Sequence, residues 1–387
     1  MPKIAMLHSE WNGCAHWRVF EPARFLNKLK GWEIVYFPKT KQLKGNLDYY
    51  KKKCEGCDLI VSMRVDNIKS VQMLMVLRHV CKVPLVFETD DDFQNVDHYN
   101  ISAHHWKFGS EPYTCGTLQQ AESDLNQFST MPLKRKFGYA NSWVLPNLID
   151  VEKVGALRQE NDTDFIRIGW AGSATHYKDL HGIIPAIDRI LAEHKNVKFV
   201  PIGMKTDFMH KDYNEHEKVH TLKDRYEYTE GAHFRKWPKL LAAAKLDAVV
   251  IPLEDIVFNR SKSNCRYLEL SSLKIPGIYG GVTPYSDTIN HGKNGYIVNP
   301  MEVSARKLSR STIEKWYEYL KMLVESKDLR EEIGGAAHEN VKNNYSLQNN
   351  LNKWSDAYEE MLKSNVSLHD IGEAERYFEE EGIDLGV

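Results

Sequence analysis

The sequence lacks a long hydrophobic run and lacks a strong charge of either sign. No stretch approaches the roughly 18 apolar residues that a membrane-spanning helix requires, and the opening MPKIAMLHSEW lacks the apolar core of a signal peptide. The formal net charge is only -2, so bulk electrostatic binding to nucleic acid is not expected. We therefore expect a cytoplasmic protein that at most touches a membrane surface.

Closely spaced cysteines are also scarce. Of the six cysteines, only Cys54 and Cys57 have the spacing of a metal or redox motif, and neither a second CxxC nor a nearby pair of histidines accompanies them. A zinc or redox site is therefore disfavoured, and reduced thiols are the better interpretation. Short internal repeats and low-complexity segments are absent as well.

What the sequence does contain is the composition and pattern of a globular α/β protein. It has 387 residues, 42% of them hydrophobic and 27% charged, which suits two domains of ordinary size. Expected strands alternate with expected helices in both halves, and this alternation predicts doubly wound parallel sheets. The expected strands are residues 4–8, 32–36, 59–62, 85–88 and 143–145, then 166–170, 197–202, 247–251 and 296–298.

The polar turn after the expected strand 247–251 is the most informative stretch. It carries Arg260, Lys262 and Ser263 just before a helix with apolar residues in helical spacing. The first N–H groups of a helix have no internal partner, and the macrodipole adds partial positive charge there. A diphosphate set against those amides would also meet the cations of Arg260 and Lys262. The alternative is a solvated basic turn before an ordinary amphipathic helix.

An acid follows these cations on the same expected helix. Glu269 lies six residues after Ser263, nearly two turns further along. A carboxylate at that distance does not help a phosphate, but it can accept paired hydrogen bonds from a ribose diol. Cations for phosphate followed by an acid for sugar predict a nucleotide site.

Two further loops of the second half belong to this predicted site. The loop AGSATHYKDL follows the strand 166–170, where Gly172 and Ser173 let a ligand approach the backbone and Lys178 can reach an anion. Gly281 marks a turn that lets a sugar or a phosphate sit close to the backbone.

Three adjacent acids, Asp90, Asp91 and Asp92, follow the expected strand 85–88. Carboxylates this close repel one another, and a metal, a basic neighbour or a hydrogen-bonded sugar usually offsets that cost. We expect at least one of them to face a bound ligand or to take part in catalysis. The alternative is a solvated turn in which one aspartate caps a helix.

Two loops of the first half are candidates for a second ligand site. Gly13 permits a tight backbone before the first helix, and His16 and Arg18 follow it. The loop lies at the carboxyl end of the first strand, where open α/β sheets bind ligands. His98 opens a second loop rich in aromatic residues, which can stack on sugar or base rings or serve as ordinary packing.

The run NRSKSNCRYLELSSLKIPGIYG, with GVTPYSDTI and HGKNGYIV after it, resembles the donor-binding region of GT-B glycosyltransferases that use nucleotide sugars. The resemblance is strongest to the large retaining family 4, which usually carries a Glu-x7-Glu motif. Glu269 matches the second Glu, whereas Ser261 stands at the position of the first. The family's usual Gly-Arg pair reads Gly169 and Trp170 here, so its phosphate contact would come from Lys178 or Arg260.

The resemblance implies the fold and the reaction. It implies two Rossmann-like domains facing a cleft: residues 1–150 for the acceptor and 151–345 for the nucleotide-sugar donor, with helices in 346–387 packing back on the first domain. The first-half candidates would then lie on the acceptor side: Gly13, His16, Arg18 and His98, with Asp90, Asp91 and Asp92 facing the acceptor or taking part in catalysis. It implies transfer of a sugar from a nucleotide diphosphate sugar to a hydroxyl, with retention of configuration. It also implies that no metal and no cofactor take part.

Several acceptors and functions stay open at this point. The basic segment from Lys39 to Lys53 suits a glycan or lipid-linked acceptor at a membrane surface. Hydroxymethylated DNA is a second possible acceptor, because some viral base-modifying glycosyltransferases have this fold. The protein could also be a nucleotide-sugar-binding protein that has lost catalysis, or a sugar-nucleotide epimerase related by fold.

Overall fold

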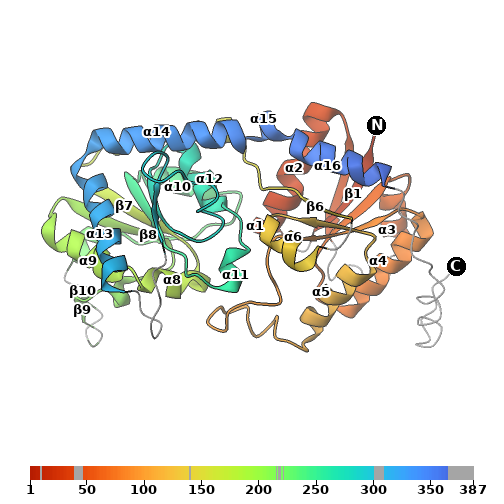
Figure 1. Cartoon of the computed structure of the whole chain (residues 1–387), viewed down its shortest axis with the longest axis horizontal. Helices are drawn as coiled ribbons and strands as arrows, with labels where there is room; N and C mark the ends of the chain where they lie inside the picture. The colour runs from red at the N-terminus through yellow and green to blue at the C-terminus, as the bar shows by residue number, and fades with distance from the viewer. Residues whose placement is uncertain are drawn as a thin grey trace. The chain divides into compact units, whose positions relative to one another are not determined.

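The chain forms two compact units, each built around its own parallel sheet (Figure 1). Unit 1 comprises Met1–Val96, His104–Leu148 and the segment from Asn350 onward, and unit 2 comprises Ile149–Asn349 together with Asp97–Ala103. The prediction of two doubly wound α/β units is therefore confirmed. The computed structural model describes residues 1–8, 11–38, 47–138, 141–214, 216, 219–220, 222–299 and 309–364.

The sheet of unit 1 has six parallel strands in the order β2-β1-β3-β4-β5-β6. Every residue of β3, β4 and β5 is buried, as expected for a parallel sheet that helices cover on both faces. The order reverses between β1 and β3, which makes their loops a topological switch point. The strands are β1 (Lys3–His8), β2 (Glu33–Pro38), β3 (Leu59–Met63), β4 (Leu85–Thr89), β5 (Leu125–Phe128) and β6 (Ser142–Val144).

The helical stretch after β1 begins earlier than the sequence predicted, because it includes Gly13, which was expected before the first helix. Asn12 caps it by accepting a hydrogen bond from the Ala15 amide at 3.0 Å. Its parts are α1 (Gly13–Ala15), a π-helical turn (His16–Phe20), α2 (Glu21–Phe25) and a second π-helical turn (Leu26–Lys30). The other helices of unit 1 are α3 (Leu47–Cys54), α4 (Ile68–Cys81), α5 (Glu111–Glu122), α6 (Met131–Phe137) and α16 (Asn352–Lys363).

The sheet of unit 2 repeats the same plan with the order β11-β8-β7-β12-β13-β14. The order reverses between β7 and β12, so the chain leaves these two neighbours toward opposite sides of the sheet. Its strands are β7 (Ile166–Ala171), β8 (Val197–Gly203), β11 (Thr229–Glu230), β12 (Ala248–Ile251), β13 (Gly277–Gly280) and β14 (Tyr296–Val298). A separate antiparallel pair, β9 (Tyr213–Asn214) and β10 (Val219–His220), lies outside this sheet.

The helices of unit 2 correct one local prediction. The polar turn expected to carry Arg260, Lys262 and Ser263 begins inside a helix, α11, which includes Arg260. The helices are α7 (Val151–Gly155), α8 (Tyr177–His181), α9 (Ile184–Glu193), α10 (Trp237–Ala243), α11 (Val257–Arg260), α12 (Cys265–Ser272), α13 (Arg310–Glu325), α14 (Lys327–Asn344) and α15 (Leu347–Asn350).

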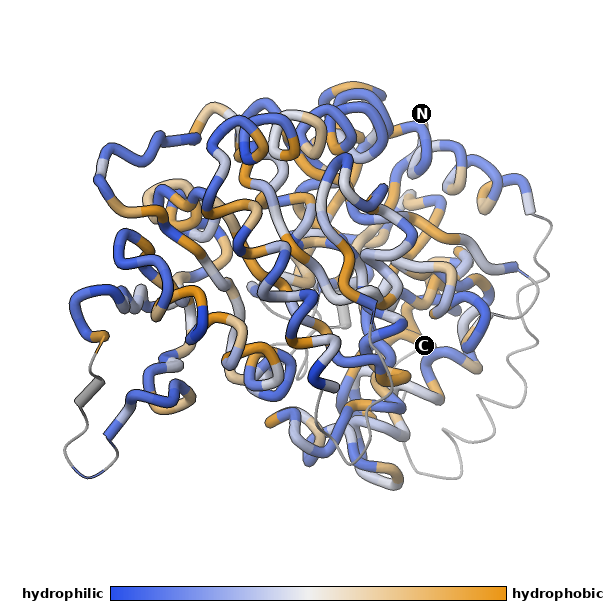
Figure 2. Tube along the Cα trace, turned by 60° about the vertical axis from the view of Figure 1, so that its left-hand side comes forward, coloured by the Kyte–Doolittle hydropathy of each residue, from blue (hydrophilic) through white to orange (hydrophobic). Residues whose placement is uncertain are grey.

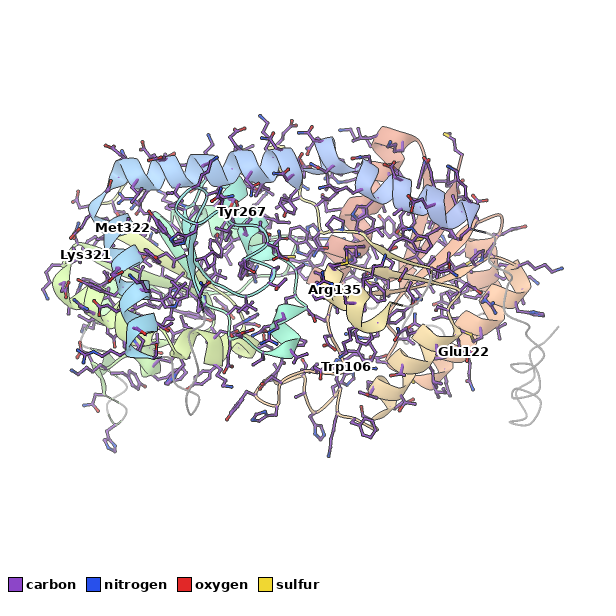
Figure 3. The ribbon with its side chains drawn as sticks, viewed as in Figure 1. Trp106, Glu122, Arg135, Tyr267, Lys321 and Met322 are labelled. Carbon is purple, nitrogen blue, oxygen red and sulfur yellow. The ribbon has the colours of Figure 1, made fainter. Side chains whose placement is uncertain are left out.

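The core of unit 2 lies between the sheet and its amphipathic helices. Figure 2 shows hydrophobic and hydrophilic positions alternating along the helices, as expected for helices that bury one face. Tyr267 of α12, labelled in Figure 3, is fully buried and meets Tyr279 of β13 edge-on, with ring centroids 5.7 Å apart. The Asn340 side chain of α14 donates a hydrogen bond to the Tyr267 hydroxyl at 2.8 Å. These contacts fix α12, the helix that carries the predicted nucleotide site.

No helix among the described residues is long and apolar enough to span a bilayer. The expected basic segment falls partly outside those residues: Lys39, Lys41 and Lys44 are not described, whereas Lys51 to Lys53 lie in the last turn of α3. Of the segment 346–387, expected to form helices that pack back on the first domain, residues 365–387 also lie outside them.

Candidate functional site

The candidate donor site lies in unit 2 at the carboxyl ends of β7 and β12. These neighbouring strands end at Ala171 and Ile251, and their loops carry the residues that the sequence predicted for phosphate binding. Ligands of open α/β sheets bind at such a switch point, because the diverging loops leave a crevice there.

Helix α12 provides an N-terminus for an anion. Its N-cap residue, Asn264, makes no side-chain cap hydrogen bond, and its side-chain amide donates instead to Thr288 Oγ1 at 3.0 Å. The first turn of α12 carries no acidic residue. The partial positive charge of the helix start is therefore not offset by the side chains of its own first turn.

The three predicted cations differ in their partners. Arg260 Nε donates to Asp255 Oδ1 at 2.6 Å, and Lys178 Nζ lies 2.9 Å from Glu254 Oε2. Lys262 makes no ion pair within the described part of the chain, and its Nζ lies 4.8 Å from the centre of the Phe258 ring. Lys262 is therefore the predicted cation whose charge is least compensated.

A histidine that the sequence analysis missed lies beside Lys262. His176 Nδ1 lies 2.7 Å from Asp179 Oδ2, and the other carboxylate oxygen accepts from the Glu254 amide at 2.7 Å and from the Asn259 side chain at 3.3 Å. Burial lowers the pKa of His176, the positive charge of Lys262 lowers it further, and the hydrogen bond to Asp179 opposes both. The i, i+3 spacing of His176 and Asp179 in ATHYKD was the available signal.

A partly exposed arginine that the sequence analysis also missed, Arg266, connects β7 with α12. Arg266 Nε donates to the carbonyl of Ala171 at 3.1 Å, and its guanidinium pairs with Glu269 Oε2. The guanidinium carbon also lies 4.6 Å from the centre of the Trp237 ring. Arg266 thus brings a cation, paired with Glu269, to the end of β7, next to the loop where the expected Gly-Arg pair is missing.

Glu269 has one carboxylate oxygen that can accept a further hydrogen bond. It is 7% exposed, and its Oε2 also accepts from Trp237 Nε1 at 3.2 Å. Its Oε1 accepts no hydrogen bond within the described residues, so this oxygen is available to a ligand hydroxyl. The expected contact with a ribose diol stays a prediction.

The small residues of the predicted site serve the packing of the chain itself. A Cβ on Gly172 would lie 2.6 Å from the Trp170 indole, and one on Gly281 would lie 2.5 Å from Asn299 Oδ1. Ser173 Oγ lies 2.7 Å from Thr175 Oγ1, and Ser263 Oγ lies 3.1 Å from Cys265 Sγ. Whether any of the four also contacts a donor stays a prediction.

The three acids of unit 1 do not act as a set. Asp92 is fully buried, pairs with Lys136 and accepts from Asn95 Nδ2 at 2.9 Å, so it stabilises the fold. Asp90 and Asp91 instead form a cluster with Cys14, in which a ligand atom from each lies within 4.8 Å of the others. Burial, together with the charges of the two acids, raises the pKa of Cys14 well above its usual range, so the thiol stays protonated.

Arg18 holds unit 1 together and does not face an acceptor. Its side chain has no exposed surface, and it makes a bidentate ion pair with Glu88, with Nε to Oε1 at 2.8 Å and Nη2 to Oε2 at 3.0 Å. Nη1 donates to the Leu145 carbonyl at 2.6 Å and to Asn147 Oδ1 at 2.9 Å. The sequence around Arg18 contains no pattern that predicts these partners.

The other three residues expected on the acceptor side have different settings. Gly13 has open space around its Cβ position and no left-handed backbone, so the conformation of the free chain does not require a glycine there. His16 is half-buried and meets Trp17 edge-on at 5.8 Å between ring centroids. His98 is exposed but lies in the Asp97–Ala103 segment, which belongs to unit 2 and not to the unit expected to bind the acceptor.

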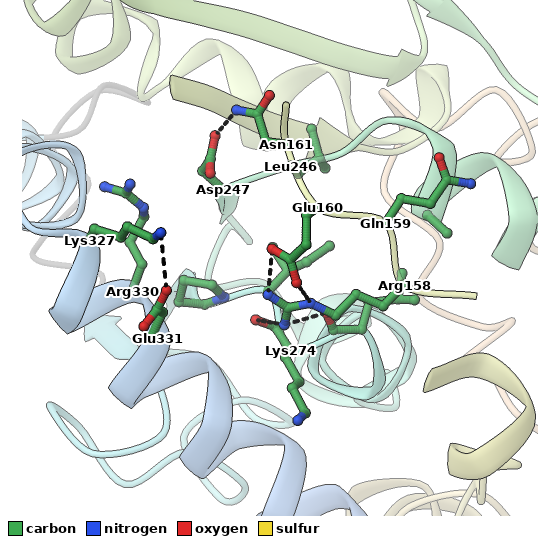
Figure 4. A pocket seen from close by; sticks show the side chains of 14 residues that line it. Arg158, Gln159, Glu160, Asn161, Leu246, Asp247, Lys274, Lys327, Arg330 and Glu331 are labelled. Atoms are coloured by element: carbon green, nitrogen blue, oxygen red, sulfur yellow. Dashed lines mark hydrogen bonds and ion pairs between the residues drawn. The ribbon is translucent and has the colours of Figure 1, made fainter. Parts of the chain in front are cut away.

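A pocket at the opposite edge of the same sheet is distinct from this site. Figure 4 shows it beside Asp247, which precedes β12, and Lys274, which precedes β13. Both basic and acidic side chains line it. Arg158 donates hydrogen bonds to the carbonyls of Leu273 and Lys274 at 3.2 and 3.3 Å. These bonds tie the segment after α7 to the end of α12.

Comparisons with known proteins add a fold likeness. Neither a scan of protein-family models nor a search of curated proteins finds a match. Solved structures do match. HepE from Anabaena, crystallised in complex with UDP and glucose, aligns over 94% of this chain and 100% of its own with 15% identity and a TM-score of 0.63.

Two further structures have the same fold and different stated activities. Sucrose-phosphate synthase from Thermosynechococcus elongatus aligns over 94% of this chain and 100% of its own, with 11% identity and a TM-score of 0.63. A protein described as a UDP-N-acetylglucosamine 2-epimerase from Listeria monocytogenes covers 92% and 97%, with 12% identity and a TM-score of 0.53. At these identities the likeness shows the fold, which is the two-unit α/β fold of the GT-B class.

Proposed function

We propose that this protein is a glycosyltransferase that takes a sugar from a nucleoside diphosphate sugar bound by unit 2 and passes it to an acceptor hydroxyl bound by unit 1. The observation that carries the proposal is the meeting of the uncapped start of α12, Lys262, Arg266 and His176 at the β7/β12 switch point. This collects positive charge where a phosphate can reach it.

Each part of the donor finds a matching group in this arrangement. The diphosphate lies against the first amides of α12 and near Lys262, and Arg266 adds a second cation at the end of β7. Glu269 Oε1 accepts from the ribose diol. Breakage of the glycosidic bond leaves negative charge on the diphosphate, and these fixed cations stabilise it. Retention of configuration is part of the proposal and rests on the family resemblance alone.

The residues proposed for the acceptor are Asp90 and Asp91, whose carboxylates can accept hydrogen bonds from acceptor hydroxyls. A glycan or a lipid-linked sugar is the proposed acceptor class. HepE was crystallised with UDP and glucose, so UDP-sugars are the first donors to test. No metal and no cofactor is part of the proposal.

The test is a donor screen with full-length protein. Nucleotide sugars are incubated with and without glycan and DNA acceptors, and free nucleoside diphosphate and transferred sugar are measured. Lys262→Ala should weaken donor affinity about 5- to 150-fold, because one lost charge-assisted hydrogen bond costs about 1–3 kcal/mol. Lys195→Ala, which removes an exposed lysine on the turn after α9, is the matched control and should change nothing.

Three results would reject the proposal in different ways. Normal donor affinity in Lys262→Ala would reject the site. Donor binding with neither release nor transfer on any acceptor would indicate a binding protein without catalysis. Interconversion of epimeric nucleotide sugars without release of diphosphate would indicate an epimerase. This outcome is included because the matched Listeria protein is described as an epimerase.

A further inference from the structure

Three aromatic side chains form a partly exposed cluster in unit 1, which we call the aromatic platform: Trp11, Phe20 and Tyr36. Trp11 stacks on Phe20 with ring centroids 4.6 Å apart and an interplanar angle of 22°, and Tyr36 meets Phe20 edge-on at 5.4 Å. The buried ring of His8 supports Trp11 and Phe20 through edge contacts at 5.3 and 5.0 Å. The platform is therefore held in one shape by its own ring contacts.

Two rings of the platform are much more exposed than the neighbouring aromatic residue of β2. Trp11 is 49% and Tyr36 is 45% exposed, whereas Phe37, the next residue of β2, is 2% exposed. Large rings left in water cost free energy, and a rigid exposed aromatic patch commonly marks a binding surface. Two-χ aromatic side chains also lose little entropy when a ligand stacks on them.

The position of the platform agrees with a ligand site. His8 is the last residue of β1, Trp11 follows three residues later, and Tyr36 lies two residues from the end of β2. The carboxyl ends of parallel strands form the edge where α/β sheets bind ligands. This is the same edge of the unit 1 sheet from which Asp90 and Asp91 extend after β4.

The acidic cluster belongs to the same loop region as the platform. Cys14, whose thiol lies with the carboxylates of Asp90 and Asp91, is three residues after Trp11. Three residues of chain place the Cα atoms of Trp11 and Cys14 at most about 11 Å apart. The platform and the two carboxylates are therefore treated as parts of one candidate subsite.

An aromatic face beside carboxylates suits the two surfaces of a sugar. The C–H groups of a pyranose ring form an apolar face that packs on an indole, and its hydroxyls donate charge-assisted hydrogen bonds to carboxylates. A nucleic acid fits less well, because the carboxylates repel its phosphates. A folded protein partner needs an interface of about 1,000 Å² or more, which three rings do not supply.

We propose that the aromatic platform is a carbohydrate subsite that stacks a pyranose ring of the acceptor on the exposed face of Trp11, with Asp90 and Asp91 accepting hydrogen bonds from its hydroxyls. This inference rests on the proposed function, because it defines the acceptor of the same reaction as a glycan. It adds the residues that select the acceptor and separates glycan from DNA.

The experiment measures glycan binding without requiring turnover. Full-length protein is applied to an array of defined oligosaccharides, and a duplex containing 5-hydroxymethylcytosine is included as a competing probe. The wild type should bind a subset of pyranose glycans and not the duplex, Trp11→Ala should weaken that binding at least tenfold, and Trp11→Phe should restore part of it. Phe108→Ala removes another exposed aromatic side chain, 81% exposed, and should leave glycan binding unchanged.

The outcomes separate this inference from the proposed function. Binding of UDP, measured by calorimetry, should be equal in the wild type and Trp11→Ala, and this equality also shows that the variant is folded. Glycan binding that Trp11→Ala leaves intact, binding of no glycan by the wild type, or preference for the duplex would overturn the inference even if donor use is normal. Trp11-dependent glycan binding in a protein that binds no nucleotide sugar would keep the platform and reject the glycosyltransferase.

Discussion

His176 shows how one titratable group can report on the donor site. Its pKa is lowered by burial and by Lys262, so the imidazole is neutral at pH 7 in the free protein. A bound diphosphate would place negative charge beside the same ring and favour its protonated form. Proton uptake and donor binding are therefore coupled.

The expected result is a donor affinity that rises as the pH falls below about 6.5, the ordinary pKa of histidine. The sign follows because the bound anion raises the pKa of His176, so the complex binds more protons than the free protein. Calorimetric titration of a nucleotide sugar between pH 5.5 and 8 measures it, since a diesterified diphosphate does not titrate in this range. His176→Gln should flatten the profile, and an unchanged profile in this variant would place the anion elsewhere.

Among the elements of unit 1, Arg18 and Glu88 connect the helical stretch after β1 with the end of β4. Burial raises the pKa of Glu88, and the charge of Arg18 opposes that rise. The pair also contacts β5 and α16. Gln127 of β5 donates a hydrogen bond to Glu88 Oε2 at 2.5 Å. The ring centre of Trp354 of α16 lies 4.8 Å from the Arg18 guanidinium. Trp354 Nε1 donates to the Pro146 carbonyl at 2.8 Å, which completes the anchor of α16.

Arg18→Met should lower the free energy of unfolding by about 3–5 kcal/mol at pH 7, because it leaves Glu88 buried without a counter-charge. In this variant the folded-state pKa of Glu88 lies above its unfolded value, so the loss should be largest at neutral pH and should shrink as the pH falls toward 5. Urea unfolding at both pH values measures it.

Two controls distinguish the buried charge from lost packing. Adding Glu88→Gln to Arg18→Met should recover part of the stability at pH 7 by removing the uncompensated charge. Arg24→Met breaks a half-exposed pair with Glu21 and should cost no more than about 1 kcal/mol. Equal losses in the Arg18 and Arg24 variants would show that the buried pair is not important for the stability of unit 1.

At the scale of the whole molecule, the donor should stabilise unit 2 through the loops at the carboxyl edge of its sheet. A ligand at 100 times its dissociation constant adds about 2.7 kcal/mol to the folded state. Hydrogen exchange with and without UDP should therefore slow in peptides covering residues 172–181 and 257–272. Peptides covering β5 and α6 of unit 1 are internal references.

The alternative binding site for UDP is the pocket of Figure 4 at the opposite edge of the sheet. Protection confined to residues 158–161 and 327–331, with none near α12, would move the nucleotide to that pocket and contradict the assigned donor site.

The sequence by itself determined the fold class and supplied the prediction for one end of the candidate site. Alternating apolar runs and helical periods specify parallel α/β units, because each element must bury its apolar face locally. The polar turn ahead of α12 is likewise a local feature, so Arg260, Lys262 and Ser263 could be named in advance. The roles of the two units, acceptor binding by one and donor binding by the other, stay predictions.

Only the tertiary structure decided which distant residues meet. Arg266 reaches the end of β7, a contact between residues 95 apart in sequence, and Arg18 reaches Glu88 across 70 residues. Asp92 pairs with Lys136 while its neighbours Asp90 and Asp91 join Cys14, although the three acids look alike in sequence. Such partners depend on strand order, which long-range packing selects, and local sequence does not encode it.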